Sequence, residues 1–310
     1  MRVFITGIGG FVGSRLARHL LARGDRVSGT YIGPAPAFPD VDLHEVDLLD
    51  REGLTRVIAT ADPDAIVNLA GISSIGGSWK AAAMPDYFWV NLVGTENLLA
   101  AAAGRKVIIA SSADVYGEVP PEEQPISEDR PVSPRSPYAL TKAASERLAF
   151  ASGHAVVARS FNMIGPGQAR EFVLPSFALQ LAAIARGEAE PVLKVGNLTA
   201  HRDFVHVDDG AEAYRLLAEK GEPGGVYNIA TGQASSIEEI LHRLMAISGV
   251  EARVEVDPER FRKADLPLLT GDASRLRTLG WEPGRTLDDA VKDLWKDFGA
   301  LGPIQIGGLR

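Results

Sequence analysis

The chain has 310 residues, of which 45% are hydrophobic and 23% charged, as in an ordinary globular protein with an extensive buried core. This composition excludes a disordered tail, a collagen-like fibre and a coiled coil. The net charge is −8 and no lysine- or arginine-rich cluster is present, so nucleic acid is not an expected partner. The sequence has no cysteine, which excludes disulfides, thiolate zinc sites and a cysteine nucleophile.

Neither a signal peptide nor a membrane segment is expected. The chain begins MRVFITG, which is typical of a strand, and no apolar run approaches the roughly 18 residues that a membrane span requires. We therefore expect a cytoplasmic protein with no membrane partner.

Strand-like and helical segments alternate through the first half of the chain. The apolar patterns predict strands at Val3–Thr6, Arg26–Tyr31, Ala65–Ala70, Lys106–Ser111 and Ala155–Ser160, and helices at Phe11–Arg23, Leu54–Thr60, Met84–Ala103 and Tyr138–Ala151. Near-continuous apolar strands that alternate with helices are typical of a buried parallel sheet covered on both faces. The Pro-rich segment Pro120–Pro137 is expected to be a surface loop.

After about residue 160 this alternation is less regular. The patterns predict helices at Phe177–Arg186, Ala211–Gly221, Ser236–Ser248 and Leu287–Phe298, a strand at Val226–Ile229, and a polar loop over Lys194–Phe204. The fold class expected is α/β, a doubly wound parallel sheet with a smaller α/β lobe. The large domain should comprise residues 1–164 with about 201–232, and the lobe residues 165–200 and 233–310.

A glycine-rich turn follows the first predicted strand. Its glycines, Gly7, Gly10 and Gly13, are spaced GxxGxxG and precede a helix. Glycines at such a turn let the backbone approach a pyrophosphate, which the helix N-terminus attracts, so the turn predicts an NAD(P)-binding Rossmann domain. The second strand ends in Gly29–Ile32, with neither an acid for a ribose hydroxyl nor a base for a 2′-phosphate. We expect NADP(H) as the cofactor, with NAD(H) tolerated.

A tyrosine and a lysine four residues apart are predicted to share one helix face. Tyr138 and Lys142 have this spacing, and a strand that ends in Ser111-Ser112 precedes them by about 26 residues. A nearby cation should lower the pKa of a tyrosine, so that its phenol can exchange a proton with a carbonyl that gains or loses hydride. A hydroxyl at a strand end, Ser112, could bond the same carbonyl oxygen.

Taken together, these motifs resemble the extended short-chain dehydrogenase/reductase family that acts on nucleotide sugars. The resemblance is carried by TGIGGFVG (6–13), Asp47-Leu48, NLAG (68–71), VNLVGTENLL (90–99), SSADVYG (111–117), SPYALTK (136–142) and SFNMIGPGQ (160–168). The segments VGNLTAHRDFVHVDD (195–209) and FRKADLPLLTGDASRL (261–276) are similar to the GDP-mannose branch, its 4,6-dehydratases and more closely its 4-keto-6-deoxymannose reductases.

The resemblance implies specific roles for many residues. Ser112, Tyr138 and Lys142 would be catalytic, and Asn91 would help to orient the surroundings of Lys142. The cofactor would be bound by Gly7, Gly10, Phe11, Val12, Gly13, Thr30, Asp47, Leu48, Leu69, Ala70, Gly71, Tyr138 and Lys142. The substrate would be bound by Ser112, Asn162, Arg202, Arg262 and Asp265. A structural ion pair with Asp203, Asp208 or Asp209 is the alternative for Arg202.

The reaction expected is NAD(P)H-dependent reduction of the 4-keto group of GDP-4-dehydro-6-deoxy-D-mannose to GDP-D-rhamnose. A GDP-mannose 4,6-dehydratase is the alternative, since Asp114 could serve as a base, although a loop-capping carboxylate is the interpretation we favour for it. Another epimerase or dehydratase of the family and a non-catalytic NAD(P)-binding regulator also remain open. The resemblance implies a homodimer through residues 84–103 and 138–151. His201 and His206 have no third ligand nearby, so no metal site is expected.

Overall fold

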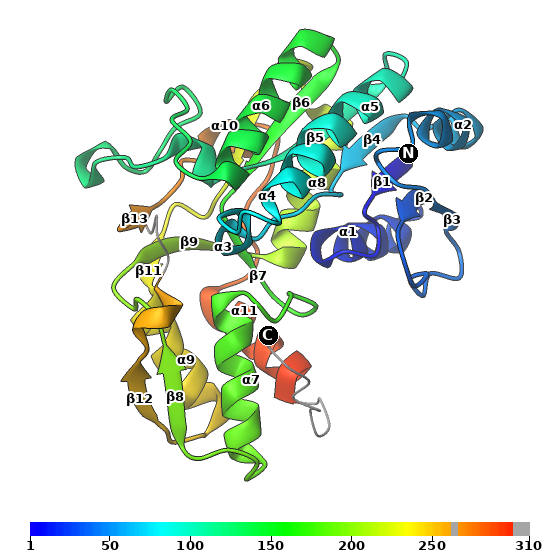
Figure 1. Ribbon diagram of the computed structural model, residues 1–310. Helices are drawn as coiled ribbons and strands as arrows, with labels where there is room; N and C mark the ends of the chain where they lie inside the picture. The colour runs from blue at the N-terminus through cyan, green and yellow to red at the C-terminus, as the bar shows by residue number, and fades with distance from the viewer. Residues whose placement is uncertain (262–265, 300–310) are drawn as a thin grey trace.

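The computed structural model describes residues 1–261 and 266–299. A parallel sheet of seven strands, flanked by helices on both faces, forms the larger part, and a lobe of short strands and helices lies below it in Figure 1. The expected doubly wound α/β fold is therefore confirmed. Within the described residues, none of the helices combines the length and the apolar character needed to cross a membrane.

The seven-stranded sheet has the order β10-β6-β5-β4-β1-β2-β3. Its strands are β1 (Arg2–Thr6), β2 (Arg26–Tyr31), β3 (Asp42–Glu45), β4 (Ala65–Asn68), β5 (Lys106–Ser112), β6 (Ala155–Ser160) and β10 (Val226–Ile229). The chain runs outward from β1 through β2 to β3 and then returns to β4 on the other side of β1. This reversal between β1 and β4 makes a switch point, and ligands of such sheets bind outside the strand ends there.

Successive side chains of the strands enter opposite cores, as the period of two requires. On β1, Val3 and Ile5 pack with α1 (Phe11–Ala22) and α8 (Val207–Lys220), whereas Phe4 packs with the helices of the other face. That other face is covered by α2 (Arg51–Ala61), α5 (Gly94–Ala101) and α6 (Pro137–Ser152). Both faces of the sheet are thus covered, which is why its central strands β1, β4, β5 and β6 contain long apolar runs, whereas the edge strand β3 is partly exposed.

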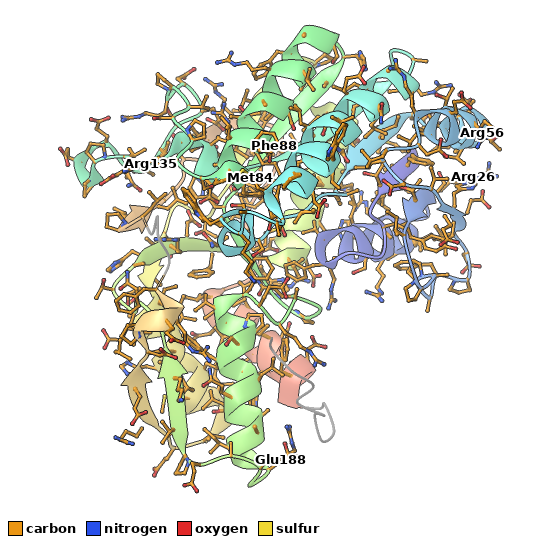
Figure 2. All side chains as sticks on the ribbon, viewed as in Figure 1. Arg26, Arg56, Met84, Phe88, Arg135 and Glu188 are labelled. Atoms are coloured by element: carbon orange, nitrogen blue, oxygen red, sulfur yellow. The ribbon has the colours of Figure 1, made fainter. Side chains whose placement is uncertain are left out.

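The lobe has a hydrophobic core of its own. Leu174 and Leu181 on α7 (Val173–Ala185) pack with Leu241 on α9 (Ile237–Ser248) and Leu294 on α11 (Leu287–Gly299). The short strands of the lobe are β7 (Asn162–Ile164), β8 (Val192–Val195), β9 (His201–His206), β11 (Ala234–Ser236), β12 (Arg253–Val256) and β13 (Leu268–Leu269). Charged residues cover the outside of the molecule, and Figure 2 shows Arg26, Arg56, Arg135 and Glu188 extending from its periphery.

Two predicted segments differ from the structure. The expected loop Lys194–Phe204 contains the end of β8 and much of β9. Its polar residues are interspersed with buried Val195, Ala200 and Phe204, and these short, mixed strands resemble a loop in sequence. The expected helix Met84–Ala103 is divided into α4 (Met84–Tyr87), the π-helical segment η1 (Phe88–Val93) and α5.

The remaining elements are short. They comprise α3 (Ile75–Ser78), α10 (Ser274–Thr278) and the 3₁₀ segments η2 (Ala113–Tyr116), η3 (Pro121–Glu123) and η4 (Pro258–Arg260). The Pro-rich segment Pro120–Pro137 is fixed to the fold rather than loose, because Ile126 pairs with Gly271 and Glu128 is buried.

Candidate active site

The glycine turn holds the ends of β1 and β4 together at the switch point. Gly7 has φ +67°, and a side chain there would place Cβ only 2.8 Å from the backbone of Ala70. A Cβ on Gly13 would lie 2.3 Å from the carbonyl oxygen of Gly7. Among the residues that the structure describes, no side chain caps the start of α1, so its first-turn N–H groups are available to an anion. The turn therefore has the cradle that a pyrophosphate needs.

A groove of about 510 Å³ extends from this turn across the ends of β1, β2 and β4. It is lined by the predicted cofactor residues Gly7, Gly10, Thr30, Asp47, Leu48, Leu69, Ala70 and Gly71. We call it the cofactor groove. Asn97 donates a hydrogen bond of 3.0 Å to the carbonyl of Leu48 and so fixes the Asp47–Leu48 segment to α5.

A second cavity, of about 370 Å³, adjoins the cofactor groove and shares Gly10, Leu69 and Gly71 with it. Its lining includes the predicted residues Phe11, Val12, Gly13, Ser112, Tyr138, Lys142 and Asn162. We call it the catalytic cavity. All three predicted catalytic residues, which come from β5 and α6, thus face one space beside the glycine turn.

Local sequence fixes how Tyr138 and Lys142 enter this cavity. Ser136 caps α6 by accepting a hydrogen bond from the backbone N–H of Ala139 at 3.1 Å, and Pro137 occupies the first turn. The Lys142 ammonium donates to the carbonyl of Ala110 at 2.8 Å and lies 5.9 Å from the centre of the Tyr138 ring. The lysine is therefore held between the end of β5 and the tyrosine.

The charge states of this pair differ from the expectation. Burial raises the pKa of Tyr138 above its usual value, the charge of Asp114 raises it further, and a hydrogen bond with Ser112 acts in the opposite direction. Burial also lowers the pKa of Lys142 to about 8, against an upward influence of Glu146. The expected lowering of the tyrosine pKa by the lysine is thus wrong for this structure, because desolvation dominates.

Asp114 lines the catalytic cavity from the 3₁₀ turn that follows Ser112. It was expected to cap a loop, but Ser112 is the capping residue of η2, since its hydroxyl accepts from the Asp114 N–H at 3.2 Å. The Ser112 hydroxyl in turn donates to the Asp114 carboxylate at 2.8 Å, and Asp114 lines the catalytic cavity. Its position two residues after a serine at a strand end was the signal for this role.

Asn91 lies in the π-helical segment and joins three parts of the site. Its amide oxygen accepts from the Ile72 N–H at 2.8 Å, and its amide nitrogen donates to the Ile72 carbonyl at 3.0 Å and to Thr141 at 3.1 Å. A side chain on Gly71 would bring Cβ within 3.6 Å of the Lys142 ammonium nitrogen. Asn91 therefore holds the 71–72 turn against the part of α6 that carries Lys142.

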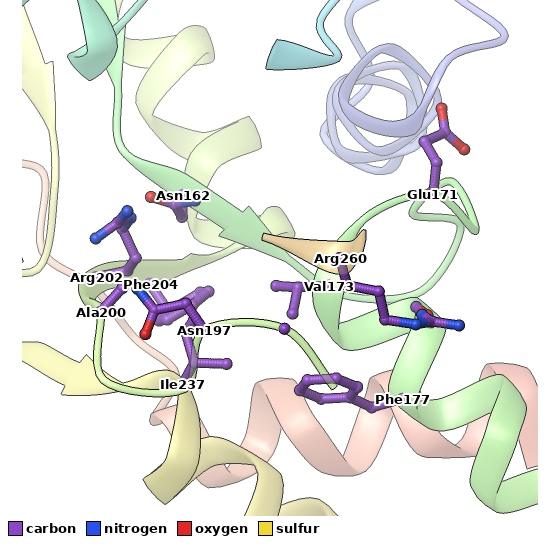
Figure 3. Close-up of a pocket in the computed structure, with 12 residues that line it drawn as sticks. Asn162, Glu171, Val173, Phe177, Asn197, Ala200, Arg202, Phe204, Ile237 and Arg260 are labelled. Carbon is purple, nitrogen blue, oxygen red and sulfur yellow. The ribbon is translucent and has the colours of Figure 1, made fainter. Parts of the chain in front are cut away.

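A third cavity, of about 260 Å³, continues from the catalytic cavity into the lobe, and Asn162 and Glu171 line both. Figure 3 shows Arg202, Asn162 and Asn197 on one side of it and Arg260 on another. We call it the lobe cavity. The Arg202 guanidinium donates to the carbonyls of His201 at 2.8 Å and Leu266 at 2.6 Å.

The three carboxylates that the sequence offered as ion-pair partners of Arg202 have other donors in the structure. Asp203 is fully buried and accepts from Thr231, Gly232 and Gly271, while Asp209 accepts from Arg285. Asp208 forms an ion pair with Arg285 at 3.2 Å.

Two predicted substrate residues, Arg262 and Asp265, lie outside the described residues. Arg260, which was not predicted, lines the lobe cavity two positions before Arg262. Its backbone carbonyl would lie 2.7 Å from a Cβ on Gly196, so a glycine is needed where the two backbones meet. The basic run Arg260-Phe261-Arg262-Lys263 was the signal that could have indicated it.

Comparison with known proteins shows the family of the chain. The profile of the family described as GDP-mannose 4,6 dehydratase matches residues 4–294. The chain is 36% identical to GDP-6-deoxy-D-mannose reductase of Pseudomonas aeruginosa, over 96% of this chain and 97% of that protein.

Solved structures agree over nearly the whole chain. RMD from Pseudomonas aeruginosa complexed with NADPH is similar with a TM-score of 0.84 and 34% identity, covering 96% of this chain and 99% of that chain. UDP-glucose 4-epimerase from Thermus thermophilus, in complex with NAD, is similar with a TM-score of 0.86 and 31% identity, covering 97% of this chain and 100% of that chain.

Proposed function

Because this chain belongs to the GDP-mannose 4,6-dehydratase family, we propose that it is an NAD(P)H-dependent nucleotide-sugar 4-ketoreductase. The substrate would be GDP-4-dehydro-6-deoxy-D-mannose and the product GDP-D-rhamnose. The observation that carries the proposal is that Ser112, Tyr138 and Lys142 face one cavity, which joins the cofactor groove on one side and the lobe cavity with Arg202 on the other. The similarity to GDP-6-deoxy-D-mannose reductase supports the choice of substrate.

The cofactor proposed is NADP(H), with NAD(H) tolerated. The uncapped N-terminus of α1 and the close approach of Gly7 and Gly13 to neighbouring backbone fit a pyrophosphate. Thr30 and Tyr31 line the groove at the end of β2, and neither side chain carries a negative charge that would repel a 2′-phosphate. When bound, the reduced nicotinamide supplies a hydride to a carbonyl carbon.

In this proposal the protein supplies the proton and orients the carbonyl. Tyr138 donates its phenol proton to the oxygen at C4. Ser112, whose hydroxyl turns from the Asp114 carboxylate to the substrate, donates a hydrogen bond to the same oxygen. The raised pKa of Tyr138 favours the protonated phenol, which is the form that a reduction consumes. Lys142 stabilises the phenolate left behind and holds the nicotinamide ribose.

The lobe cavity would bind the nucleotide end of the substrate. Arg202 and Arg260 both line it, and guanidinium groups pair well with the oxygens of a diphosphate. Asn162 lies where this cavity meets the catalytic one, so it would contact the sugar or the adjoining phosphate. For Arg262 and Asp265 we propose the same nucleotide-binding role.

A 4,6-dehydratase is the second candidate, and Asp114 favours it. Elimination of water across C5 and C6 of a 4-keto sugar requires a base for the C5 proton, and the Asp114 carboxylate lines the cavity that holds Tyr138. The residue is short, however, and it already accepts a hydrogen bond from Ser112. A UDP-sugar epimerase is a weaker candidate because the segments 195–209 and 261–276 resemble the GDP-mannose branch. A non-catalytic NAD(P)-binding regulator is weaker because Ser112, Tyr138 and Lys142 are all present.

The test is nicotinamide absorbance with purified protein, NADPH and GDP-4-dehydro-6-deoxy-D-mannose, with GDP-mannose alone as the control. Stoichiometric loss of NADPH that requires the keto sugar would establish the reductase. If GDP-mannose is instead converted to a keto sugar without loss of NADPH, the protein is the dehydratase and Asp114 becomes its base. Retained cofactor with no turnover of any nucleotide sugar would favour the regulator.

A further inference from the structure

A buried charged pair lies behind the catalytic cavity, one helical turn after Lys142. Glu146 on α6 and Arg159 on β6 are only 2% and 5% exposed, and neither is among the residues that line the cavity. Apolar residues of similar volume usually pack as well as a buried ion pair, because the pair must overcome the cost of removing two charges from water. The pair therefore calls for a role that apolar residues would not fill.

The Glu146 carboxylate is held by three hydrogen bonds. Arg159 donates from Nε to Oε1 at 2.9 Å and from Nη2 to Oε2 at 2.8 Å, and the Ser111 hydroxyl donates to Oε1 at 2.5 Å. Ser111 and Arg159 are also partners in the register of β5 and β6. The carboxylate is thus fixed to both strands in a two-pronged geometry that leaves it little freedom.

The arginine of this pair also contacts η2, the segment that contains Asp114. The Arg159 guanidinium lies 4.8 Å from the centre of the Tyr116 ring and donates to the carbonyl of Glu128 at 3.2 Å. Tyr116, the last residue of η2, donates to Asn228 on β10 at 2.7 Å. Arg159 therefore links Glu146 to the turn that follows Ser112.

On its other side Glu146 adjoins the lysine. The two residues are four apart on α6 and lie on one face of the helix. Lys142 donates to the carbonyl of Ala110, and Ser111, the next residue of that strand, donates to Glu146. One carboxylate thus fixes the strand end to which the lysine is attached and places a negative charge near the ammonium group.

We propose that Glu146 is the positioning residue of the active site, whose fixed negative charge maintains the ammonium form of Lys142, with Arg159 and Ser111 holding the carboxylate in place. Arg159 compensates part of that charge and so limits its effect. This inference rests on the role given to Lys142 in the proposed function.

The charges around Lys142 are consistent with this role. Glu146 follows Lys142 by one turn of α6, and the other titratable residues that line the same cavity as the lysine are Tyr138 on α6, Asp114 on η2, Tyr214 on α8 and Glu171 in the loop before α7. Burial lowers the pKa of Lys142 to about 8, and the charge of Glu146 is the influence that raises it. Without that charge the lysine would lose its proton at a still lower pH.

The experiment measures the ionisation of Lys142 directly, without any sugar substrate. Cyanate carbamylates only the neutral amine, and mass spectrometry of the peptide that contains Lys142 gives the labelling rate from about pH 6 to about pH 10, the range in which a perturbed lysine titrates. The proteins compared are wild type, Glu146→Gln, Arg159→Gln and, as the control, Arg147→Gln, which removes an exposed charge from the same helix.

The two variants should move the titration in opposite directions. In Glu146→Gln the labelling midpoint should fall by about one pH unit, and in Arg159→Gln it should rise, because the carboxylate is then uncompensated. The control should keep the wild-type midpoint. A purely structural role does not predict that the two midpoints shift in opposite directions. The proposal is therefore overturned if both variants keep the wild-type midpoint or if both midpoints shift in the same direction. If neither variant folds, the pair is a structural element and the proposal is also overturned.

The alkaline limb of the pH profile of keto-sugar reduction is the second readout and should move with the labelling midpoint. Because the labelling needs no substrate, it also separates the two hypotheses. Opposite shifts in a protein that reduces no keto sugar would refute the proposed function and leave the role of Glu146 standing. If the protein reduces the keto sugar but the labelling midpoints do not move, the role of Glu146 is refuted and the proposed function stands.

Discussion

The phenol of Tyr138 is the group on which the proposed chemistry depends most directly. Replacing it in Tyr138→Phe removes the proton donor but leaves the ring that fills the same space. We expect kcat for keto-sugar reduction to fall by about 10²- to 10⁴-fold, the usual contribution of a general acid. NADPH affinity, measured by fluorescence titration, should stay within about twofold, which is near the precision of such free-energy comparisons.

A comparable loss of NADPH affinity in Tyr138→Phe would contradict this assignment. Ser112→Ala offers a matched comparison, since it removes a hydrogen-bond donor to the same oxygen without removing the proton. Its loss in kcat should be smaller than that of Tyr138→Phe.

Lys142 should set an alkaline limit to activity. Burial lowers its pKa to about 8, so the ammonium form is present below that pH and is lost as the pH rises through it. We therefore expect kcat/KM for the keto sugar to be level near neutral pH and to fall with a midpoint near pH 8. A profile that stays level up to about pH 10, the range of an ordinary lysine, would exclude this role.

Residues differ in how well sequence alone places them. Tyr138, Lys142 and Ser112 are found by spacing, since helix periodicity and the end of a strand fix where they point. Asp114 and Arg260 depend on the path of short turns, which no periodicity reports. The charge states of Tyr138 and Lys142 are not accessible either, because they depend on how much water the fold removes around them.

At the scale of elements, the glycine turn couples stability to cofactor binding. A methyl group on Gly13 would lie 2.3 Å from the Gly7 carbonyl oxygen, so Gly13→Ala must force the turn open. We expect NADPH affinity to weaken at least about tenfold, a change of about 1.4 kcal/mol, and the melting temperature of the protein without cofactor to fall.

Gly9→Ala is the control for that prediction. A Cβ at Gly9 would meet only Pro36, at 3.5 Å, which is an ordinary contact distance. Its melting temperature should equal that of the wild type by calorimetry. If Gly13→Ala has the same melting temperature as Gly9→Ala and binds NADPH with wild-type affinity, the close packing of the turn is not what shapes the cofactor groove.

Elements with strong patterns are predictable here, and those that depend on distant partners are not. The parallel strands and long helices follow from apolar runs and helical periodicity. In contrast, β8 is half of a two-stranded ribbon with β12, and β9 pairs with β7, β11 and β13. The π-helical turn at Phe88–Val93 depends on Asn91 reaching Ile72 and Thr141, a contact no local pattern encodes.

At the scale of the whole molecule, the three cavities follow one another from the sheet to the lobe. The cofactor groove belongs to the sheet, the lobe cavity belongs mainly to the second hydrophobic core, and the catalytic cavity lies between them. In the proposed function, a substrate would therefore contact both parts of the chain when its carbonyl lies at Tyr138. On this proposal, the residues that select the nucleotide would belong to the lobe, and those that carry out the chemistry at the sugar would belong to the sheet domain.

The last prediction concerns assembly. Trp89 in η1 and Leu140 on α6 are 57% and 49% exposed, and these two elements lie against each other. Large apolar side chains on neighbouring helical elements favour an interface, and we expect a homodimer through this face. Trp89→Glu would place a charge at the interface and should give a monomer in sedimentation-velocity experiments. Val256→Glu, which charges an equally exposed position on β12 in the lobe, should leave the dimer intact. A wild-type protein that sediments as a monomer, or dissociation by both substitutions alike, would contradict this interface.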